Sequence, residues 1–318
     1  MTQKKRPRDY LKNPVTIFIY SQHRWISNCF KYLKNPVSSL FFKAGILKTY
    51  NVKVKNTNYE IRIRNKNSLN RIMFVLPGIQ EELFESFFDY IKDLENDVEQ
   101  VSIDGIKYIN VFNSEFEKTH PYNYAIHIDE FFTGDEWDMI SYSGRHIIDI
   151  GGNVGDTALY FAKEGAEVIS FEPVRHLYEL AEENVQINPQ YKDKITLVNK
   201  GVGGSKGTLT FSDVSVNGYV EGNQYEMEII SISDLLNDYD FTPDILKMDC
   251  EGCEFEVISK HDLTMFNDII FEHHAQMVNK DHRTLIDILE NQGFKTNIYP
   301  CNASDSNIEE MGIIHAFK

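Results

Sequence analysis

Short apolar runs alternate with segments of helical spacing between residues 145 and 299, and this alternation is the strongest constraint on the fold. Strands that alternate with helices form a parallel, doubly wound sheet with right-handed crossovers. The predicted parallel strands are residues 146–150, 167–171, 195–198, 244–248 and 268–271, and an antiparallel pair is predicted at 294–299 and 313–317. We therefore predict an α/β domain over residues 141–318.

Residues 1–140 lack this alternation and are predicted to form an α+β accessory region behind a basic arm. Apolar residues alternate with bases over 50–64, which predicts two strands that turn at Asn56-Thr57-Asn58. Apolar spacing over 80–96 predicts a helix, and short strand-like pieces follow near 101–112. No motif in this region indicates a function.

The net charge of -16 is distributed unevenly along the chain. Residues 1–64 contain 14 Lys and Arg but only two acids, so the remaining residues contain 18 bases and 46 acids. An acidic body repels phosphate groups, which argues against nucleic acid as a partner. The basic segment could contact an anionic membrane surface, or it could be a solvated face packed against the acidic body.

The chain contains four cysteines, Cys29, Cys250, Cys253 and Cys301, which are too few to suggest a disulfide framework. No apolar run approaches the roughly 20 residues needed to cross a bilayer, and no secretory signal pattern is present. We expect a cytoplasmic protein in a reducing compartment, with peripheral membrane contact through the basic segment as a further possibility.

The segment Asp149-Ile-Gly151-Gly-Asn153-Val-Gly155-Asp156 follows one predicted strand and opens a helix. Glycines at such a turn let the backbone approach a ligand, and the helix N-terminus offers N–H groups that have no partner within the helix. Glu172 ends the next predicted strand, where its carboxylate can accept both hydroxyls of a ribose. The turn and this acid together predict a site for a nucleoside-containing cofactor.

Two cofactor classes compete for this turn. A nicotinamide dinucleotide favours Gly-x-Gly-x-x-Gly, with room for a pyrophosphate. This chain instead has Gly-x-Asn-x-Gly, preceded by the acid Asp149. A carboxylate beneath the turn favours the ammonium and sulfonium of S-adenosylmethionine and opposes a pyrophosphate. We therefore expect S-adenosylmethionine as the cofactor.

These motifs resemble the FkbM family of methyltransferases over roughly residues 140–300. The family pattern is matched by Asp149–Asp156, by Phe171-Glu172-Pro173, and by Lys247-Met-Asp249-Cys-Glu251-Gly252-Cys-Glu254. The resemblance implies a class I, Rossmann-like methyltransferase fold whose seven-stranded sheet contains one antiparallel strand. It also implies methyl transfer to oxygen, often on sugar or polyketide hydroxyls.

Cys250 and Cys253 depart from the family pattern, which usually has an aliphatic residue and Ala at these positions. We expect both to behave as small buried hydrophobic residues. Their spacing resembles half of a structural zinc site, but no second pair of ligands completes it, so no metal is assigned.

Methyl transfer requires the acceptor oxygen, the methyl carbon and the sulfur in line, and the acceptor must lose a proton. The carboxyl ends of the fourth and fifth strands should supply the base, and the titratable residues there are Asp249, Glu251, Glu272, His273 and His274. We select Asp249, Glu251 and His273 as the catalytic residues. The two histidines could instead be structural, and Glu251 could instead shape a turn.

A divalent metal at the same strand ends is a separate possibility. Asp249, Glu272 and His273 could bind Mg²⁺, which would acidify a sugar hydroxyl. Carboxylates are expected beside a cationic cofactor in any case, so Mg²⁺ is possible but not favoured.

The predicted function is O-methylation of a sugar, glycan or other polyhydroxylated metabolite. We expect Asp149, Gly151, Asn153 and Gly155 to hold the methionine end of the cofactor. Glu172 is expected to hold the ribose, and Asn199, which follows the third strand, is expected near the adenine. Two alternatives stay open: N-methylation, which the absence of an Asn-Pro-Pro-Tyr type segment disfavours, and a non-catalytic cofactor-binding or assembly role.

Overall fold

The computed structural model divides the described part of the chain into two units. The smaller unit holds the described residues up to Asn96, and the larger unit holds those from Glu99 onward. The described residues are 25–79, 83–96, 99–109, 139–212, 224–239, 242–300 and 311–318, together with His23 and Trp137.

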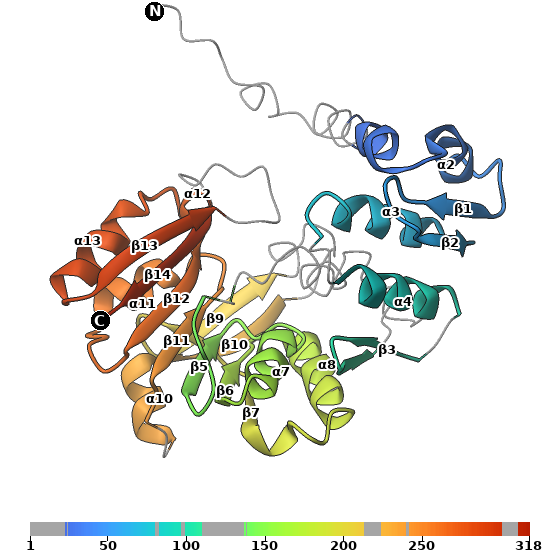
Figure 1. The fold of residues 1–318 in the computed structure, drawn as a ribbon. Helices are drawn as coiled ribbons and strands as arrows, with labels where there is room; N and C mark the ends of the chain where they lie inside the picture. The colour runs from blue at the N-terminus through green and yellow to red at the C-terminus, as the bar shows by residue number, and fades with distance from the viewer. Residues whose placement is uncertain are drawn as a thin grey trace, which may run out of the picture. The chain divides into compact units, whose positions relative to one another are not determined.

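The larger unit is built on a seven-stranded sheet with the order β13-β14-β12-β11-β5-β6-β7 (Figure 1). Its strands are β5 (His146–Ile150), β6 (Glu167–Phe171), β7 (Ile195–Val198), β11 (Ile245–Met248), β12 (Asp268–His273), β13 (Lys295–Pro300) and β14 (Gly312–Phe317). Only β14 runs antiparallel to its neighbours. The predicted class I methyltransferase fold, with its seven strands and one antiparallel strand, is therefore confirmed.

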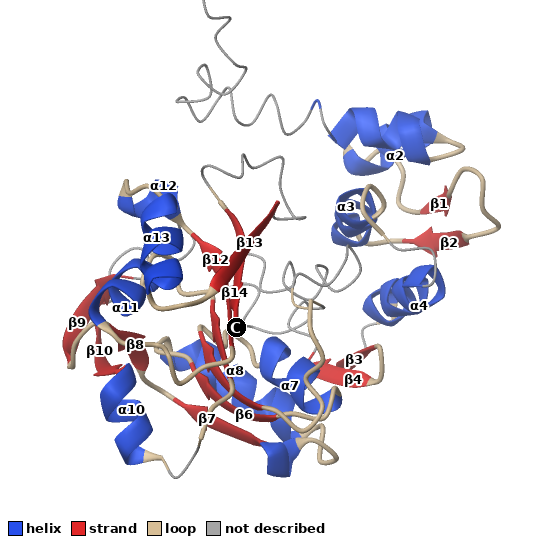
Figure 2. Ribbon diagram, turned by 60° about the vertical axis from the view of Figure 1, so that its left-hand side comes forward, coloured by secondary structure: helices blue, strands red, loops and turns tan. Residues whose placement is uncertain are grey.

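Helices follow the parallel strands and cover the sheet on both faces (Figure 2). They are α7 (Asp156–Lys163), α8 (Arg175–Gln186), α11 (Glu254–Lys260), α12 (Ala275–Val278) and α13 (Arg283–Asn291), with a single 3₁₀ turn, η4 (Lys192–Lys194), before β7. Because α7, α8, α11 and α12 each begin within a few residues of a strand end, their N-termini gather at the carboxyl edge of the sheet, where ligands of such folds bind.

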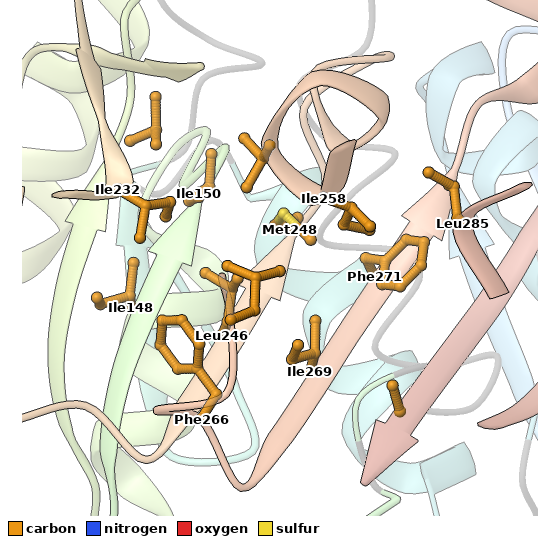
Figure 3. Close-up of a cluster of buried hydrophobic side chains, with 14 of the residues drawn as sticks. Ile148, Ile150, Ile232, Leu246, Met248, Ile258, Phe266, Ile269, Phe271 and Leu285 are labelled. Carbon is orange, nitrogen blue, oxygen red and sulfur yellow. The ribbon is translucent and has the colours of Figure 1, made fainter. Parts of the chain in front are cut away.

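One face of the sheet carries the main hydrophobic core (Figure 3). Alternate strand residues point to the same face, so Ile148 and Ile150 of β5 lie level with Leu246 and Met248 of β11. Side chains from α11 and α13, among them Ile258, close this core from outside. The core aligns the carboxyl ends of β5 and β11 side by side, and both motif-bearing loops follow these ends.

The hairpin β3 (Gln100–Ile103) and β4 (Ile106–Ile109) packs on the larger unit through two asparagines of the α8 region. Asn184 accepts a hydrogen bond from the N–H of Ile109 at 2.8 Å, and its amide donates to the carbonyl oxygen of Val154 at 2.9 Å. Asn188 accepts from the N–H of Lys107 at 2.9 Å. The hairpin therefore belongs with the larger unit, whereas the sequence analysis placed it in the accessory region that ends at residue 140.

A second sheet of the larger unit has the order β8-β10-β9. Its strands are β8 (Gly201–Gly203), β9 (Gly207–Ser212) and β10 (Gln224–Ser231). A capping box formed by Ser231 and Asp234 then begins α10 (Ile232–Asp238).

The smaller unit contains the hairpin β1 (Tyr50–Lys53) and β2 (Glu60–Ile63) with helices α2 (Pro36–Lys43), α3 (Lys66–Val75) and α4 (Phe84–Glu95). Alternate residues of the two strands are buried, and Asn56 takes the left-handed φ of +59° in the turn. The predicted strand pair and the predicted helix near 80–96 are thus confirmed. Among the described helices of both units, none is long and apolar enough to span a bilayer.

Candidate active site

The turn between β5 and α7 depends on two glycines. Gly151 adopts a φ of +80°, and a Cβ on it would lie 1.8 Å from the carbonyl oxygen of Asp249. Gly155 adopts a φ of +78°, and a Cβ there would lie 3.1 Å from the Cβ of Ala181. Only glycine combines this conformation with such close approach. The two glycines therefore let the turn lie directly against the loop after β11 and against α8.

Asp149 lies beneath this turn and is fully buried. Its Oδ1 is 2.8 Å from Nζ of Lys247, and its Oδ2 accepts hydrogen bonds from the hydroxyls of Thr157 and Ser170 at 2.9 and 2.7 Å. These contacts compensate its charge inside the protein. Asp149 therefore braces the turn from below, and its contact with the methionine end of the cofactor stays a prediction.

Lys247 is the buried partner of Asp149, and sequence reasoning gave it no role. Its Nζ also donates to the carbonyl oxygen of Gly151 at 3.0 Å, so one ammonium ties β11 to both β5 and the glycine turn. Burial disfavours this ammonium, but the charges of Asp149 and Asp249 outweigh burial and raise the pKa of Lys247. The lysine is consequently charged at neutral pH.

Glu172 is almost fully buried at the end of β6. Its Oε2 accepts a hydrogen bond from the N–H of Asn153 at 2.9 Å, and its Oε1 accepts from the N–H of Val174 at 2.8 Å. Burial raises the pKa of Glu172 to about 7, although the two hydrogen bonds oppose this rise. The carboxyl group therefore lies beside the glycine turn and titrates near neutral pH.

Asn153 and Asn199 have different surroundings. Asn153 adopts a left-handed φ of +46°, and its side-chain oxygen is buried without a hydrogen-bond partner among the described residues. Buried acceptors normally have a hydrogen-bond partner. The Asn153 oxygen lacks one among the described residues, so it can accept a hydrogen bond from a bound ligand. Asn199 donates to the carbonyl oxygens of Glu172 and Pro173 at 2.8 and 3.2 Å, so it holds the chain after β6. Its place near the adenine stays a prediction.

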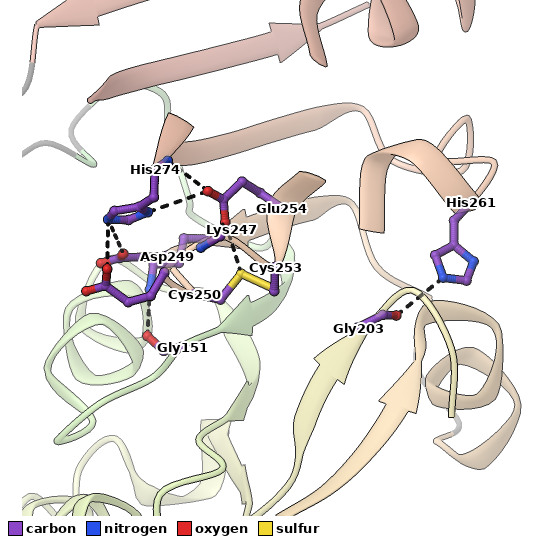
Figure 4. Close-up of a disulfide and its surroundings, with 11 residues drawn as sticks. Gly151, Gly203, Lys247, Asp249, Cys250, Cys253, Glu254, His261 and His274 are labelled. Carbon is purple, nitrogen blue, oxygen red and sulfur yellow. Dashed lines mark hydrogen bonds and ion pairs between the residues drawn. A yellow bond between two sulfur atoms is a disulfide. The ribbon is translucent and has the colours of Figure 1, made fainter. Parts of the chain in front are cut away.

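Four carboxylates surround the imidazole of His274 at the carboxyl ends of β11 and β12. Figure 4 shows two of them, Asp249 and Glu254, beside the ring. Its Nε2 lies 3.4 Å from Glu251, 3.9 Å from Asp249 and 4.0 Å from Glu272. Its Nδ1 lies 3.5 Å from Glu254. The structure thus brings two of the three predicted catalytic residues, Asp249 and Glu251, to one imidazole.

His273, the third predicted catalytic residue, lies away from this cluster. It is fully buried, and its ring stacks on that of His282 with 4.7 Å between centroids. Neighbouring residues at a strand end point in opposite directions, so only one of two adjacent histidines can face the carboxylates. His274, which precedes the short helix α12, is the one that faces them, and the catalytic role of His273 stays a prediction.

The charge of His274 follows from its neighbours. Burial disfavours the imidazolium cation, because it removes the ring from water. The hydrogen bond to Glu254 and the charges of Asp249, Glu251 and Glu272 outweigh burial and raise the pKa of His274 to about 10. His274 is therefore protonated at neutral pH in this structure, and the cluster around it keeps a net negative charge.

Glu254 is a further functional candidate, which belongs to the motif after β11 but is not among the catalytic residues predicted from the sequence. It is completely buried at the start of α11. Its Oε1 accepts a hydrogen bond from the backbone N–H of His274 at 2.8 Å, and its Oε2 accepts from the N–H of Gly252 at 3.0 Å. A glutamate in the first turn of a helix is common, so only its burial against His274 distinguishes it.

Glu251 and Gly252 form the turn between β11 and α11, with φ values of +57° and +112°. A non-glycine residue rarely adopts this conformation, and such residues cluster at functional sites. The Glu251 carboxylate is also more than half exposed, while its oxygen lies against His274. The turn-shaping role considered for Glu251 and its contact with the imidazole therefore coexist.

Cys250 and Cys253 form a disulfide in this loop (Figure 4). The expectation of two separate hydrophobic cysteines is therefore wrong. Their Cα atoms lie 5.4 Å apart because the two cysteines end a four-residue turn, in which the N–H of Cys253 donates to the carbonyl oxygen of Cys250 at 3.4 Å. This separation is within the range of a disulfide. The bond also removes the half zinc site that their spacing suggested.

Asp249, Glu272 and His274 could together hold a metal ion, because their ligand atoms all lie within 4.8 Å of one another. The set considered from the sequence had His273 in place of His274. At neutral pH the proton on His274 already balances part of the negative charge in this cluster. A cationic ligand of another kind, such as a sulfonium, would be favoured by the same field.

Comparison with known proteins gives one family match and several distant structural matches. Residues 149–296 match the family model described as the methyltransferase FkbM domain. No curated protein matches the chain. Among solved structures, a methyltransferase FkbM from Methylobacillus flagellatus KT is 12% identical with a TM-score of 0.42, and the match covers 79% of this chain and 59% of that chain.

Two further solved structures are similar at low identity. A putative transferase from Pyrococcus horikoshii is 14% identical with a TM-score of 0.41, and the match covers 68% of this chain and 69% of that one. TrmK from M. capricolum, solved with S-adenosyl-homocysteine, is 11% identical with a TM-score of 0.35, and the match covers 57% and 64% of the two chains.

Proposed function

Because this chain contains a methyltransferase domain of the FkbM family, we propose that it transfers the methyl group of S-adenosylmethionine to a hydroxyl oxygen of a sugar, glycan or other polyhydroxylated metabolite. The observation that carries this proposal is the carboxylate cluster around His274, which lies beside the glycine turn. Such a cluster favours a cationic methyl donor and a neutral acceptor, and it disfavours a phosphate at the same place.

The residues of the glycine turn fit the methionine and ribose parts of this cofactor. The buried oxygen of Asn153 offers an acceptor to the donor's ammonium, and Glu172 offers an acceptor to the ribose hydroxyls. When bound, S-adenosylmethionine would supply an activated methyl carbon on a positively charged sulfur, and the S–C bond that breaks on transfer would leave that sulfur as a neutral thioether. Asp149 and Lys247 hold the turn in place.

Asp249 is the base that we propose for the acceptor hydroxyl. Its side chain is 30% exposed at the end of β11, so an acceptor can reach it, whereas the side chains of His274 and Glu254 are almost fully enclosed. His274 is already protonated and cannot accept a second proton. Asp249 takes the proton that the hydroxyl loses as its new O–C bond forms, and the surrounding negative field stabilises the positive charge arriving at that oxygen.

His274 acts in this proposal as a positioning residue. Its imidazolium lies between Asp249, Glu251 and Glu272, which would otherwise repel one another. Glu251 is the second exposed carboxylate of the cluster and the alternative base. The side chain of Glu272 is nearly buried, so it contributes charge rather than direct contact with an acceptor.

The proposal is tested with methyl-labelled S-adenosylmethionine and a panel of sugars, glycans and polyols, followed by mass spectrometry of the product. We expect label on oxygen, and we expect Asp249→Asn to lower turnover by about 100-fold or more while cofactor binding stays within a few-fold. Asp262→Asn, at an exposed acid after α11, is the matched control. Label on nitrogen would support N-methylation, and cofactor binding without any transfer would support the non-catalytic alternative.

A further inference from the structure

The smaller unit exposes an unusual concentration of large apolar side chains. Of the ten that are exposed among the described residues, six lie between positions 26 and 47, with exposed fractions from 38% to 68%. They are Ile26, Phe30, Val37, Phe41, Ile46 and Leu47. Scattered single apolar residues are normal on a protein surface, whereas a group of this kind marks an interaction site.

The spacing of these residues places them on the outer sides of two helices. Ile26 and Phe30 are four positions apart on the helix that spans 25–32, and Val37 and Phe41 are four positions apart on α2. Residues at this spacing share a helix face. Phe42, the next residue along α2, is buried, so the opposite side of α2 faces the core of the unit.

The remaining two apolar residues continue this group directly after α2. The N–H groups of Ile46 and Leu47 both donate to the carbonyl oxygen of Phe41, at 2.9 and 3.3 Å. The chain therefore folds back onto the end of α2. We call the six residues, with the bases among them, the apolar–basic face.

Positive charge surrounds these apolar residues. Residues 25–79 contain ten Lys and Arg and a single acid, Glu60, which pairs with Lys53 at 2.9 Å. Lys43 lies 3.7 Å above the ring of Trp25, and Lys55 donates to the carbonyl oxygen of Phe30 at 2.7 Å. Basic side chains are thus held next to the aromatic residues of the helix that spans 25–32. No acidic residue between positions 25 and 59 compensates their charge.

We propose that the apolar–basic face docks on the surface of an anionic phospholipid bilayer. Exposed Phe, Ile and Leu side chains on short amphipathic helices enter the boundary between headgroups and acyl chains, and nearby lysines bind anionic headgroups. Aliphatic residues such as Val37 and Ile46 cannot stack on bases, which disfavours a single-stranded nucleic acid. This inference is independent of the proposed methyl transfer.

The test uses the full chain in vesicle flotation, comparing phosphatidylserine-containing vesicles with pure phosphatidylcholine vesicles. Wild type is expected to float with the anionic vesicles, and Phe30→Ser combined with Phe41→Ser is expected to lower the bound fraction at least tenfold. Lys31→Glu with Lys48→Glu, at two exposed bases, is expected to abolish the preference for anionic lipid. The matched control, Leu209→Ser with Met265→Ser, removes exposed apolar side chains of the larger unit and should bind like wild type.

Thermal melting of each variant shows that the fold is intact, and light scattering reports the oligomeric state. Wild type that stays unbound, binds both vesicles equally, or binds no better than a folded Phe30→Ser, Phe41→Ser variant would overturn the proposal. An oligomer that this double variant dissolves would assign the face to contacts between copies of the chain instead.

Discussion

The buried carboxylate of Glu254 holds His274 at two points, because it accepts the backbone N–H of His274 at 2.8 Å and lies 3.5 Å from Nδ1 of its ring. This pair turns Nε2 of the imidazole towards the partly exposed carboxylate of Asp249 and the exposed carboxylate of Glu251. A histidine that is oriented in this way by a buried acid is a common arrangement at catalytic and metal centres.

Replacing Glu254 by Gln should therefore lower the pKa of His274 from about 10 by a unit or more, because the hydrogen bond to Glu254 is the largest contribution that raises it. Turnover should fall by roughly tenfold or more, since the imidazolium would no longer hold the carboxylates in place. NMR titration of the His274 ring measures the pKa. Glu256→Gln, at an exposed acid of the same helix, is the control and should change neither quantity. An unchanged His274 pKa in Glu254→Gln would contradict this account.

Cofactor affinity should depend on the ionisation of Glu172. Its pKa is raised from 4.5 to about 7 in the folded protein, so this group favours the folded state most below pH 4.5, and that contribution is lost as the pH rises through 7. Ribose hydroxyls donate hydrogen bonds to the ionised carboxylate of Glu172. Cofactor affinity should therefore rise with pH, whereas the contribution of Glu172 to folding stability falls. Affinity for S-adenosylmethionine should fall roughly tenfold between pH 8 and pH 6.

Calorimetric titrations in buffers of different ionisation enthalpy measure both this affinity and the proton released on binding. Glu172→Gln should bind more weakly and should show no pH dependence in this range. Wild-type affinity that is constant from pH 8 to pH 6 would mean that Glu172 does not contact the cofactor.

Removing the positive charge of Lys247 should destabilise the protein strongly. Lys247→Met leaves the fully buried Asp149 without its ion-pair partner, which costs about 3–5 kcal/mol in the free energy of unfolding. Asp149→Asn in the same chain should restore part of that loss. Lys260→Met removes an exposed partner of Glu256 and should cost at most about 1 kcal/mol. Urea unfolding compares the variants, and equal losses at the two lysines would refute the role of the buried pair.

Replacing Gly151 by Ala should lower the free energy of unfolding by more than the strain of the left-handed backbone conformation alone explains. Gly151 and Gly144 have similar φ values, +80° and +73°, but only at Gly151 would a Cβ collide with backbone, at the carbonyl oxygen of Asp249. Gly144→Ala should cost about 1–2 kcal/mol, the strain of the left-handed conformation. Gly151→Ala should lose clearly more stability and should lose cofactor binding. Similar unfolding curves for the two variants would show that the close approach to Asp249 is unimportant.

The strand and helix pattern of the larger unit was predictable because apolar periodicity and glycine turns are local properties of the sequence. The glycine turn and Glu172 were likewise placed together correctly, since strand order brings their loops to one edge. Which of two adjacent histidines faces the carboxylates was not predictable, because it depends on where β12 ends. The surroundings of Asp149 were not predictable either, because the lysine that compensates its charge is 98 positions away in the sequence.

The disulfide was missed for a different reason. A low cysteine count argues only against a disulfide framework for the whole chain, whereas the geometry of one loop brings Cys250 and Cys253 together. Glu254 was passed over because a glutamate in the first turn of a helix is ordinary, and only its burial against His274 sets it apart.

The decisive measurement is calorimetric titration of S-adenosylmethionine into the purified full chain, with NAD titrated in parallel. We expect micromolar binding of S-adenosylmethionine and no measurable binding of NAD, with the Gly151→Ala variant unable to bind either. A folded wild-type chain that gives no binding heat with S-adenosylmethionine, or that binds NAD more tightly, would rule out S-adenosylmethionine as the cofactor.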